Sequence, residues 1–308
     1  MSITGETGVT GLPDPKTIKA LVLDLDGTLL APGPLLSERS VRAVKACLQK
    51  GLQVIIATGR AIEGAEPFRA ALTAIGPMIY FNGAVVADMP GGEIINITLL
   101  DKKAAEFCVG LSREMGVYYQ VFFPPGYSLT GAAGDLAAGK LPAGCKKNKI
   151  ILMTEKEGPE RDMYHNHTGI LAELGDLKEA LGRPGLEGCV KGMFLAEPDV
   201  MALVRPRLAE HFGGSVGIVQ AYRTFLEIVD AKVSKGQGLK LAMERSSLKR
   251  EEVLAFGDEE NDLSVFAEAG FSAAPSNAKD SVRAEADLVI GSNTEDGVAA
   301  FLEEFFGL

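Results

Sequence analysis

Apolar residues gather in three short runs near the start of the chain, each followed by polar or glycine-containing segments. The runs cover residues 20–25, 52–57 and 78–81. Short apolar runs bounded by turn residues indicate strands that are buried on both faces of a parallel sheet. Residues 37–50 and 67–75, which separate the runs, have the spacing and end signals of helices. The order strand, helix, strand, helix, strand predicts parallel strands joined by right-handed crossovers.

The pattern changes near residue 88 to a mixture of hairpins, helices and aromatic strands. Gly91 and Gly92 predict a hairpin turn, and glycine, proline and lysine predict loops and short pieces between residues 124 and 167. The other predicted elements are helices at 102–115, 171–181 and 199–212, and strands at 117–123, 190–195, 216–220 and 224–229. This α+β segment is large enough to form a domain of its own.

The first pattern returns after Lys235, with a helix at 238–245, a strand at 253–256 and an apolar run at 288–290. We therefore expect a discontinuous α/β core built from residues 1–86 and 232–308. Residues 87–231 are expected to form an inserted α+β domain.

Composition limits the partners and the location. The 308 residues are 46% apolar and carry a formal net charge of -10, which argues against a polyanion such as nucleic acid as the main partner. The four cysteines form no Cys-x-x-Cys pair, so neither a zinc knuckle nor a redox motif is indicated. The sequence has no secretory signal and no apolar run of ~18 residues, so we expect no membrane association and a reducing cytoplasm.

Two aspartates stand at the end of the first predicted strand. Asp24 and Asp26 are two residues apart, so both carboxylates share a face if the strand stays extended to Asp26. Two carboxylates on one face repel unless a hard cation such as Mg²⁺ lies between them. A solvated Asp-Gly turn at Asp26 and Gly27 explains the same residues without a metal.

Other polar residues follow the remaining strands. The Thr58 hydroxyl and the amides of Gly59 and Arg60 can hold a phosphoryl oxygen at a helix start, although threonine is also an ordinary N-cap. Asn82 follows the third strand, and Asp258 with Asn261 follows the strand at 253–256. Since the carboxyl ends of parallel strands share one edge of a sheet, this edge is the predicted site.

Several further residues are ambiguous. Lys235, expected in a loop, can offer a positive charge to a phosphoryl group, but most lysines are simply solvated. Glu259 and Glu260 are explained by the macrodipole of a helix start. His165 and His167, expected in a loop, lack a third metal ligand. The lysines at 146, 147 and 149 are most simply a solvated charged loop.

Taken together, four ordered motifs resemble the haloacid dehalogenase superfamily, and within it the Cof-type phosphatases with a type IIB cap. The motifs are Asp24-x-Asp26-Gly27-Thr28, Thr58-Gly59-Arg60, Lys235-Gly236 and Gly257-Asp258-x-x-Asn261-Asp262. The resemblance covers about residues 19–86 and 227–308, and it is fainter between them. It implies a Rossmann-like core with a parallel sheet and an inserted α+β cap.

The resemblance also implies roles for these residues. Asp24 is expected to attack phosphorus and form an aspartyl phosphate, with Asp26 as general acid and then general base. Mg²⁺ is expected on the carboxylates of Asp24 and Asp258 and on the backbone carbonyl of Asp26. The phosphoryl oxygens are expected to be held by Thr58, Gly59, Lys235 and Asn261, with Asn82 close to the substrate. Asp262 is expected to orient the site from behind the ligands.

The expected substrates are small phosphorylated metabolites such as sugar phosphates, selected by the cap. Two alternatives stay open. A phosphomutase would pass the same phosphoryl group to a second hydroxyl of the substrate, and a non-catalytic protein would only bind phosphometabolites. Asp26 argues against the second alternative, because a binder does not need an acid/base at that position.

Overall fold

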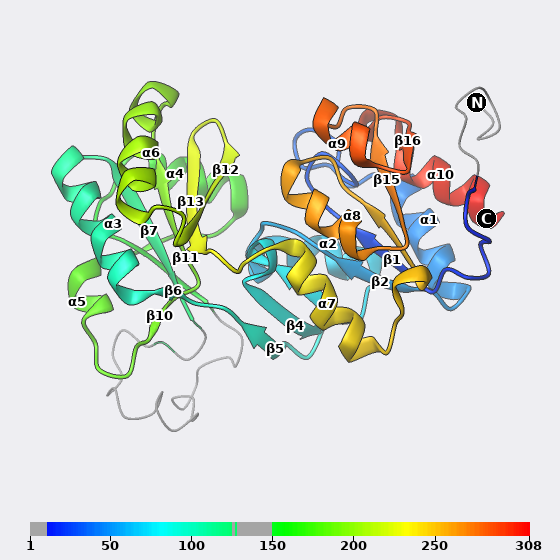
Figure 1. The fold of residues 1–308 in the computed structure, drawn as a ribbon, viewed down its shortest axis with the longest axis horizontal. Helices are drawn as coiled ribbons and strands as arrows, with labels where there is room; N and C mark the ends of the chain where they lie inside the picture. The colour runs from blue at the N-terminus through cyan, green and yellow to red at the C-terminus, as the bar shows by residue number, and fades with distance from the viewer. Residues whose placement is uncertain (1–10, 125–126, 128–149) are drawn as a thin grey trace. The chain divides into compact units, whose positions relative to one another are not determined.

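The structure, a computed structural model, describes residues 11–124, 127 and 150–308. The chain falls into two compact units. Unit 1 combines residues 1–60, 65–91 and 234–308, and unit 2 comprises residues 61–64 and 92–233. Each unit contains its own sheet and its own hydrophobic core (Figure 1).

A five-stranded parallel sheet forms the centre of unit 1, in the order β16-β15-β14-β1-β2. Every residue of β1 and β14 is buried, which explains why both sequences are continuous apolar runs. Leu21 pairs with Leu254 of β14 on one side and with Val54 of β2 on the other. The carboxyl ends of β1 and β14 therefore lie side by side. The strands are β1 (Ala20–Leu23), β2 (Gln53–Ile56), β14 (Val253–Phe256), β15 (Phe271–Pro275) and β16 (Leu288–Ile290).

Helices cover both faces of this sheet (Figure 1). On one face, Leu239 of α7, Val265 of α8 and Val282 of α9 belong to a core cluster with alternate strand residues. On the other face, Phe301 of α10 lies edge-on to Phe256, with ring centroids 5.7 Å apart, and α1 packs beside α10. The helices are α1 (Glu38–Gln49), α2 (Ile62–Leu72), α7 (Lys235–Ser246), α8 (Leu263–Glu268), α9 (Asp280–Glu285) and α10 (Gly297–Phe306), with short 3₁₀ turns η1 (Phe81–Gly83), η2 (Arg250–Glu252), η3 (Glu260–Asp262) and η4 (Asn293–Glu295).

The third predicted strand exists but pairs differently from the prediction. β3 (Gly76–Tyr80) joins β4 (Val85–Met89) and β5 (Glu93–Ile97) in a separate three-stranded sheet, and β3 runs antiparallel to β4. One parallel bridge, between Ala57 and Ile79, connects β3 to the chain after β2. The tight turn of η1 after β3 reverses the chain, so β4 becomes the main partner of β3.

Unit 2 is built on a six-stranded sheet in the order β12-β13-β11-β7-β8-β9, antiparallel except for the β8-β9 pair. A two-stranded sheet pairs β6 with β10. The strands are β6 (Leu100–Asp101), β7 (Tyr118–Phe123), β8 (Ile151–Thr154), β9 (Glu173–Leu174), β10 (Gly188–Cys189), β11 (Lys191–Leu195), β12 (Val216–Tyr222) and β13 (Phe225–Asp230), and the helices are α3 (Lys102–Met115), α4 (Pro159–Thr168), α5 (Leu177–Leu181) and α6 (Pro198–Phe212).

The two faces of the six-stranded sheet differ in chemistry. One face packs in an apolar core with α3, α5 and α6, where Tyr119 and Phe194 have ring centroids 4.5 Å apart. The other face carries a buried ion pair, in which the ammonium of Lys191 on β11 donates to Oε1 of Glu227 on β13 at 2.6 Å. The Lys191 ammonium also lies 4.9 Å from the ring centroid of Phe122 on β7. On this face Lys191 therefore contacts both a carboxylate and an aromatic ring.

Several local predictions for unit 2 are wrong. His165 and His167 lie in α4, not in a loop, and residues 171–181 do not form one helix. Instead β9 precedes α5, which begins where the Asp176 side chain accepts a hydrogen bond from the amide of Glu179 at 2.8 Å. Cys145 and the predicted lysine cluster at 146, 147 and 149 lie outside the described residues.

In unit 1, the loop predicted for Lys235 is also wrong. Lys235 is the first residue of α7, and the Ser234 side chain caps this helix by accepting from the amide of Gln237. The strand β15 was not predicted, because its Phe-Ser-Ala-Ala-Pro sequence contains few large apolar residues.

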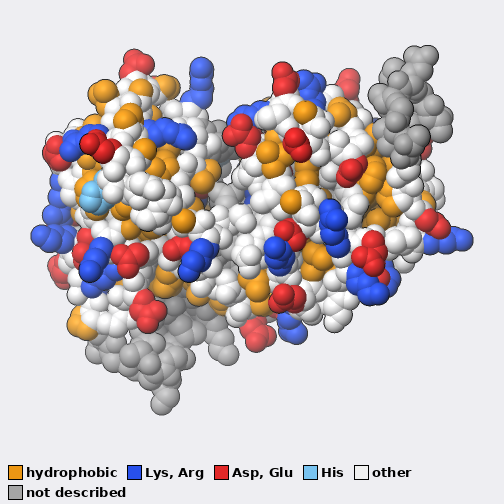
Figure 2. Space-filling model, in the orientation of Figure 1, with side chains coloured by type: hydrophobic (Ala, Val, Ile, Leu, Met, Phe, Trp, Pro, Cys, Tyr) orange, Lys and Arg blue, Asp and Glu red, His pale blue; other side chains and the backbone are white. Residues whose placement is uncertain are grey.

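The surface shows no dominant charge on the face drawn in Figure 2, where acidic and basic side chains intermingle over both units. Across the described part of the chain, every helix is too short or too polar to cross a lipid bilayer.

Candidate active site

The parallel pairing of β1 and β14 brings two buried aspartates to one edge of the sheet. Asp24 follows β1 directly, and its amide donates to the carbonyl oxygen of Phe256 at 3.1 Å. Asp258 lies two residues beyond Phe256, the last residue of β14. Asp24 is 4% exposed and Asp258 is 8% exposed. The strand-end aspartates predicted to act together are therefore neighbours.

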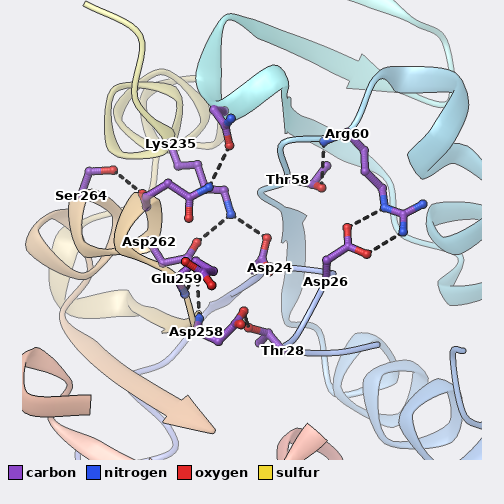
Figure 3. A network of polar contacts seen from close by, with 12 residues as sticks. Asp24, Asp26, Thr28, Thr58, Arg60, Lys235, Asp258, Glu259, Asp262 and Ser264 are labelled. Carbon is purple, nitrogen blue, oxygen red and sulfur yellow. Dashed lines mark hydrogen bonds and ion pairs between the residues drawn. The ribbon is translucent and has the colours of Figure 1, made fainter. Parts of the chain in front are cut away.

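Lys235 joins this cluster from the first turn of α7. Its ammonium donates to Oδ1 of Asp24 at 2.6 Å and to Oδ1 of Asp262 at 2.7 Å (Figure 3). Burial alone would lower the pKa of Lys235, but the charges of Asp24 and Asp262 outweigh burial and raise this pKa above its ordinary value. Lys235 is therefore a buried ammonium beside the predicted nucleophile.

The cluster contains more negative charge than Lys235 can balance. Asp24, Asp258 and Asp262 each bring a carboxylate oxygen within 4.8 Å of the others. Burial raises the pKa of Asp24 well above its ordinary value despite Lys235, and the charges of Asp262 and Asp258 raise it further. Burial and the Asp262 charge likewise raise the pKa of Asp258 to about 6, against a hydrogen bond from Thr28.

This donor set fits Mg²⁺. The ion prefers hard oxygen ligands and commonly binds one or two carboxylates, with water and phosphate oxygens completing its shell. A cation beside Asp24 and Asp258 would favour their ionised forms, against the burial and the neighbouring charges that raise the pKa of each. Asp24 and Asp258 are the better candidates, because both Asp262 oxygens already accept hydrogen bonds from Lys235, Asp258 and Glu259.

Asp262 thus acts as a structural link within the cluster. Its Oδ2 accepts from the backbone amides of Asp258 and Glu259, each at 3.0 Å, and its Oδ1 accepts from Lys235. These bonds connect the end of β14 to the start of α7. The role predicted for Asp262, to orient metal ligands from behind, stays a prediction.

Asp26 does not point where an extended strand would direct it. β1 ends at Leu23, and the carboxylate of Asp26 turns towards Arg60 while that of Asp24 turns towards Lys235 (Figure 3). Arg60 donates from Nε to Oδ2 and from Nη2 to Oδ1 of Asp26, both at 2.6 Å. The condition for both side chains to share one face, a strand extended to Asp26, is not met, because β1 ends at Leu23 and the chain turns at residue 25.

Gly27 permits the close approach of Asp258 to this turn. Gly27 has a φ of +84°, and a Cβ atom at this position would lie 2.1 Å from Oδ2 of Asp258. The next residue, Thr28, donates from its hydroxyl to Oδ1 of Asp258 at 2.7 Å. The segment after β1 therefore donates a hydrogen bond to Oδ1 of Asp258, and its backbone at Gly27 passes close to Oδ2.

The predicted phosphate-binding residues lie on adjoining segments. The amide of Thr58 donates to the carbonyl of Ile79 at 2.9 Å, and the amide of Asn82 donates to the carbonyl of Thr58 at 3.0 Å. Asn82 has a left-handed backbone, with φ 57° and ψ 27°, which asparagine tolerates well. A Cβ atom on Gly59 would lie 3.0 Å from Oδ1 of Asn82.

Asn261 reaches the same segment from η3. Its Nδ2 donates to Oδ1 of Asn82 at 2.9 Å, whereas its Oδ1 is buried and has no hydrogen-bond partner in the described chain. Thr58, Gly59, Asn82 and Asn261 are thus linked by backbone and side-chain contacts. The predicted residues gather in one place.

Three residues contribute side chains to the network of polar contacts around Asp24, Asp26, Asp258 and Lys235 (Figure 3), although the sequence indicated no role for those side chains. Arg60 and Thr28 hold Asp26 and Asp258, and the Ser264 hydroxyl links the amide of Gly236 to the carbonyl of Asn261. Arg60 and Thr28 both belong to motifs in the sequence, which was the available signal. Ser264 had none.

Of the histidines, none belongs to the network. His211 stacks on Phe107 with ring centroids 3.5 Å apart, and His167 lies edge-on to Phe225 in unit 2. Neither belongs to the group of metal-ligand candidates found in the described part of the chain, which consists of Asp24, Asp258 and Asp262.

Residues 21–302 match the model of the haloacid dehalogenase-like hydrolase family. Two curated relatives are similar over nearly the whole chain. A pyridoxal phosphate phosphatase from Escherichia coli (strain K12) is 28% identical, over 93% of this chain and 98% of its own length. A 5-amino-6-(5-phospho-D-ribitylamino)uracil phosphatase from Bacillus subtilis (strain 168) is 26% identical, over 93% and 98%.

Solved structures have the same fold. A haloacid dehalogenase-like hydrolase from Bacteroides thetaiotaomicron superposes with a TM-score of 0.78 at 23% identity, covering 94% of this chain and 100% of that one. A sugar phosphatase of HAD subclass IIB superposes with a TM-score of 0.72 at 20% identity, over 94% and 100%. The predicted fold class, a parallel α/β core with an inserted α+β cap, is confirmed.

Proposed function

From the finding that the chain belongs to the haloacid dehalogenase-like hydrolases, we propose that it is a Cof-type phosphatase of subclass IIB that hydrolyses phosphate monoesters of small metabolites through an aspartyl phosphate on Asp24. The resemblance and the class of enzyme inferred from the sequence are confirmed by this membership. The substrate class, the catalytic and binding roles of the residues, and Mg²⁺ as the cofactor belong to the proposal.

The observation that carries the proposal is the position of Asp24. It is buried at the end of β1, with the Lys235 ammonium at 2.6 Å and Asp258 beside it. A carboxylate oxygen of Asp24 attacks phosphorus in line, and the bond from phosphorus to the substrate oxygen breaks. Asp26 gives its proton to the departing oxygen. The products of this half are the free alcohol and phosphorylated Asp24.

The second half regenerates the enzyme. A water oxygen attacks phosphorus, its proton passes to Asp26, and the bond between phosphorus and the Asp24 oxygen breaks. Inorganic phosphate leaves and Asp24 is again a carboxylate. Lys235 offers positive charge to the phosphoryl oxygens, while Thr58, Gly59 and Asn261 offer hydrogen-bond donors.

Mg²⁺ is the proposed cofactor, held by the carboxylates of Asp24 and Asp258 and by the backbone carbonyl of Asp26. When bound, the ion neutralises charge on the phosphoryl group and so reduces its repulsion from the nucleophile. Asp262 and Thr28 fix the orientation of Asp258 through the backbone and side-chain bonds described above.

We further propose that unit 2 is the cap that selects the substrate, with residues 1–86 and 232–308 as core and residues 87–231 as cap. A cap excludes bulk water and contacts the leaving group. The relatives named for pyridoxal phosphate and for a phosphorylated ribitylamino uracil support a small phosphorylated metabolite, and the subclass IIB neighbour supports a sugar phosphate. A cytoplasmic location and no role for nucleic acid stay predictions.

The test is a panel of phosphate monoesters assayed for released inorganic phosphate, with Mg²⁺ and with EDTA. The panel contains sugar phosphates, pyridoxal phosphate and phosphorylated pyrimidine derivatives. We expect inorganic phosphate to be released from at least one of these classes of substrate, and only when Mg²⁺ is present. Isomerised product without free phosphate would indicate a phosphomutase, and tight binding without either product would indicate a binding protein. Either result contradicts the proposed hydrolase.

A further inference from the structure

Arg60 holds the proposed acid/base in a defined orientation. Its guanidinium donates two hydrogen bonds to Asp26, from Nε and Nη2, each at 2.6 Å. The two bonds engage both carboxylate oxygens, so they fix the rotation of the carboxylate as well as its position. The Arg60 side chain is 11% exposed and that of Asp26 is 33% exposed. Asp26 is therefore the more accessible of the two side chains, and the more buried Arg60 fixes its orientation.

Arg60 is itself held from several sides. Its amide donates to Oγ1 of Thr58 at 3.1 Å, and its carbonyl accepts from the amide of Phe81 at 3.0 Å. The guanidinium carbon lies 5.0 Å from the ring centroid of Phe68 on α2. These contacts connect Asp26 to the segment that carries the proposed phosphate-binding residues.

The bond to Arg60 separates the two carboxylates of the first motif. Asp24 points to Lys235 and Asp26 points to Arg60 (Figure 3). In an in-line displacement, the attacking and leaving oxygens lie on opposite sides of phosphorus. A group that exchanges a proton with the leaving alcohol or the attacking water must therefore stand away from the nucleophile. An Asp26 paired with Lys235 could not serve that position.

We propose that Arg60 is a positioning residue that aims Asp26 at the oxygen opposite Asp24, and that its main effect is on proton transfer. This inference rests on the proposed function of Asp24 and Asp26. Arg60 is expected to matter for turnover whenever Asp26 must exchange a proton. It is expected to matter little for a step that needs no proton from Asp26.

The substrate 4-nitrophenyl phosphate separates these cases, because 4-nitrophenolate departs without being protonated. Formation of the aspartyl phosphate then needs no proton from Asp26, whereas its hydrolysis still needs Asp26 to accept a proton from water. Rapid mixing measures the first step as a burst of nitrophenolate and the second as the steady-state rate.

For Arg60→Gln, we expect the burst rate constant to stay within about threefold of the wild type, while the steady-state kcat falls about 10- to 100-fold, as for a misplaced catalytic group. Arg60→Lys keeps the charge but loses the two-pronged bond, so it should show a smaller loss of the same kind. If Arg60→Gln fails to fold, Arg60→Lys alone makes the comparison. Asp26→Asn combined with Arg60→Gln should be no slower than Asp26→Asn alone.

A matched control is Arg39→Gln, because Arg39 also donates from Nε and Nη2 to one carboxylate, that of Glu303, elsewhere in unit 1. Both rates should stay at the wild-type values. The inference is overturned if burst and steady state fall together in the Arg60 variants, which would indicate phosphate binding or folding, or if neither changes. Absence of turnover by the wild type would instead contradict the proposed function.

Discussion

Each unit of the molecule buries a lysine against carboxylates, but the two sites balance their charges differently. In unit 2, the Lys191 ammonium donates to Oε1 of Glu227 at 2.6 Å. In unit 1, Lys235 meets Asp24 at 2.6 Å and Asp262 at 2.7 Å, with Asp258 as a third carboxylate close by. The distances are alike, so distance does not distinguish the unit 2 pair from the proposed active site in unit 1. The cluster in unit 1 stands out because it brings three buried carboxylates together beside one lysine.

The excess charge has a chemical consequence. Burial and neighbouring carboxylates raise the pKa of both Asp24 and Asp258, so the unit 1 cluster is costly to keep ionised. A bound cation would lower that cost and also prepare the site for a phosphate dianion. Strand-end carboxylates whose pKa values are raised are therefore a better indication of function than a short distance between a lysine and a carboxylate.

The largest effect is expected when the nucleophile is removed. Asp24→Asn should lower kcat by about 10⁴-fold or more, because an amide oxygen cannot form the aspartyl phosphate. Phosphate release on the best panel substrate measures the change, and circular dichroism checks that both units remain folded. Activity within tenfold of the wild type would exclude Asp24 as the nucleophile.

The balanced pair in unit 2 should contribute to stability. Lys191→Met removes the ammonium that donates to the buried Glu227 carboxylate at 2.6 Å, so the free energy of unfolding should fall by about 3–5 kcal/mol. Urea denaturation followed by circular dichroism measures the loss. The double variant with Glu227→Leu should recover most of it, since two apolar side chains can replace a buried pair. A single variant as stable as the wild type would show that the pair is not structural.

Mg²⁺ should act on unit 1 alone. At 100 times its dissociation constant, the ion should raise the free energy of unfolding by about 2.7 kcal/mol, because it binds only the folded site. A thermal unfolding series with Mg²⁺ and with EDTA measures the shift. Lys191→Met should keep the shift and Asp258→Asn should lose most of it. An undiminished shift in Asp258→Asn would place the ion elsewhere.

The smallest effect is expected from the glycine beside Asp258. Gly27→Ala should reduce the free energy of unfolding by about 1–3 kcal/mol and weaken Mg²⁺ binding, because its Cβ would lie 2.1 Å from the Asp258 carboxylate at a φ of +84°. Gly33→Ala is the matched control. Gly33 has a φ of +88°, and a Cβ atom there would have nothing within 4 Å, so this variant should lose stability by backbone strain alone. Equal Mg²⁺ affinity in both variants would contradict the role of Gly27.

Much of the core could be predicted because its strands are buried on both faces. Continuous apolar runs identified β1, β2 and β14, and parallel pairing then placed Asp24 and Asp258 together. Such a run reveals burial but not the partner strand, which is why the antiparallel pairing of β3 with β4 was missed. The helix α4 was missed because only Tyr164 in it is buried, which leaves no apolar stripe to recognise.

The directions of the site side chains were harder to predict. The turn after β1 decides where Asp26 points, and its orientation depends on Arg60, which is 34 residues away in the sequence. Likewise Lys235 was expected in a loop, although the Ser234 cap starts a helix there. Sequence motifs identified the participants, whereas the pairing between them follows from tertiary contacts that no local pattern encodes.

The most direct test of the account is a search for the covalent intermediate. The protein is mixed with Mg²⁺ and a ³²P-labelled phosphate monoester that it hydrolyses, quenched in acid during the first turnover, and digested. We expect an acid-stable, alkali-labile phosphoryl label on the peptide that contains Asp24, absent in Asp24→Asn. Phosphate release without any labelled Asp24 peptide would contradict the nucleophilic role on which the account depends.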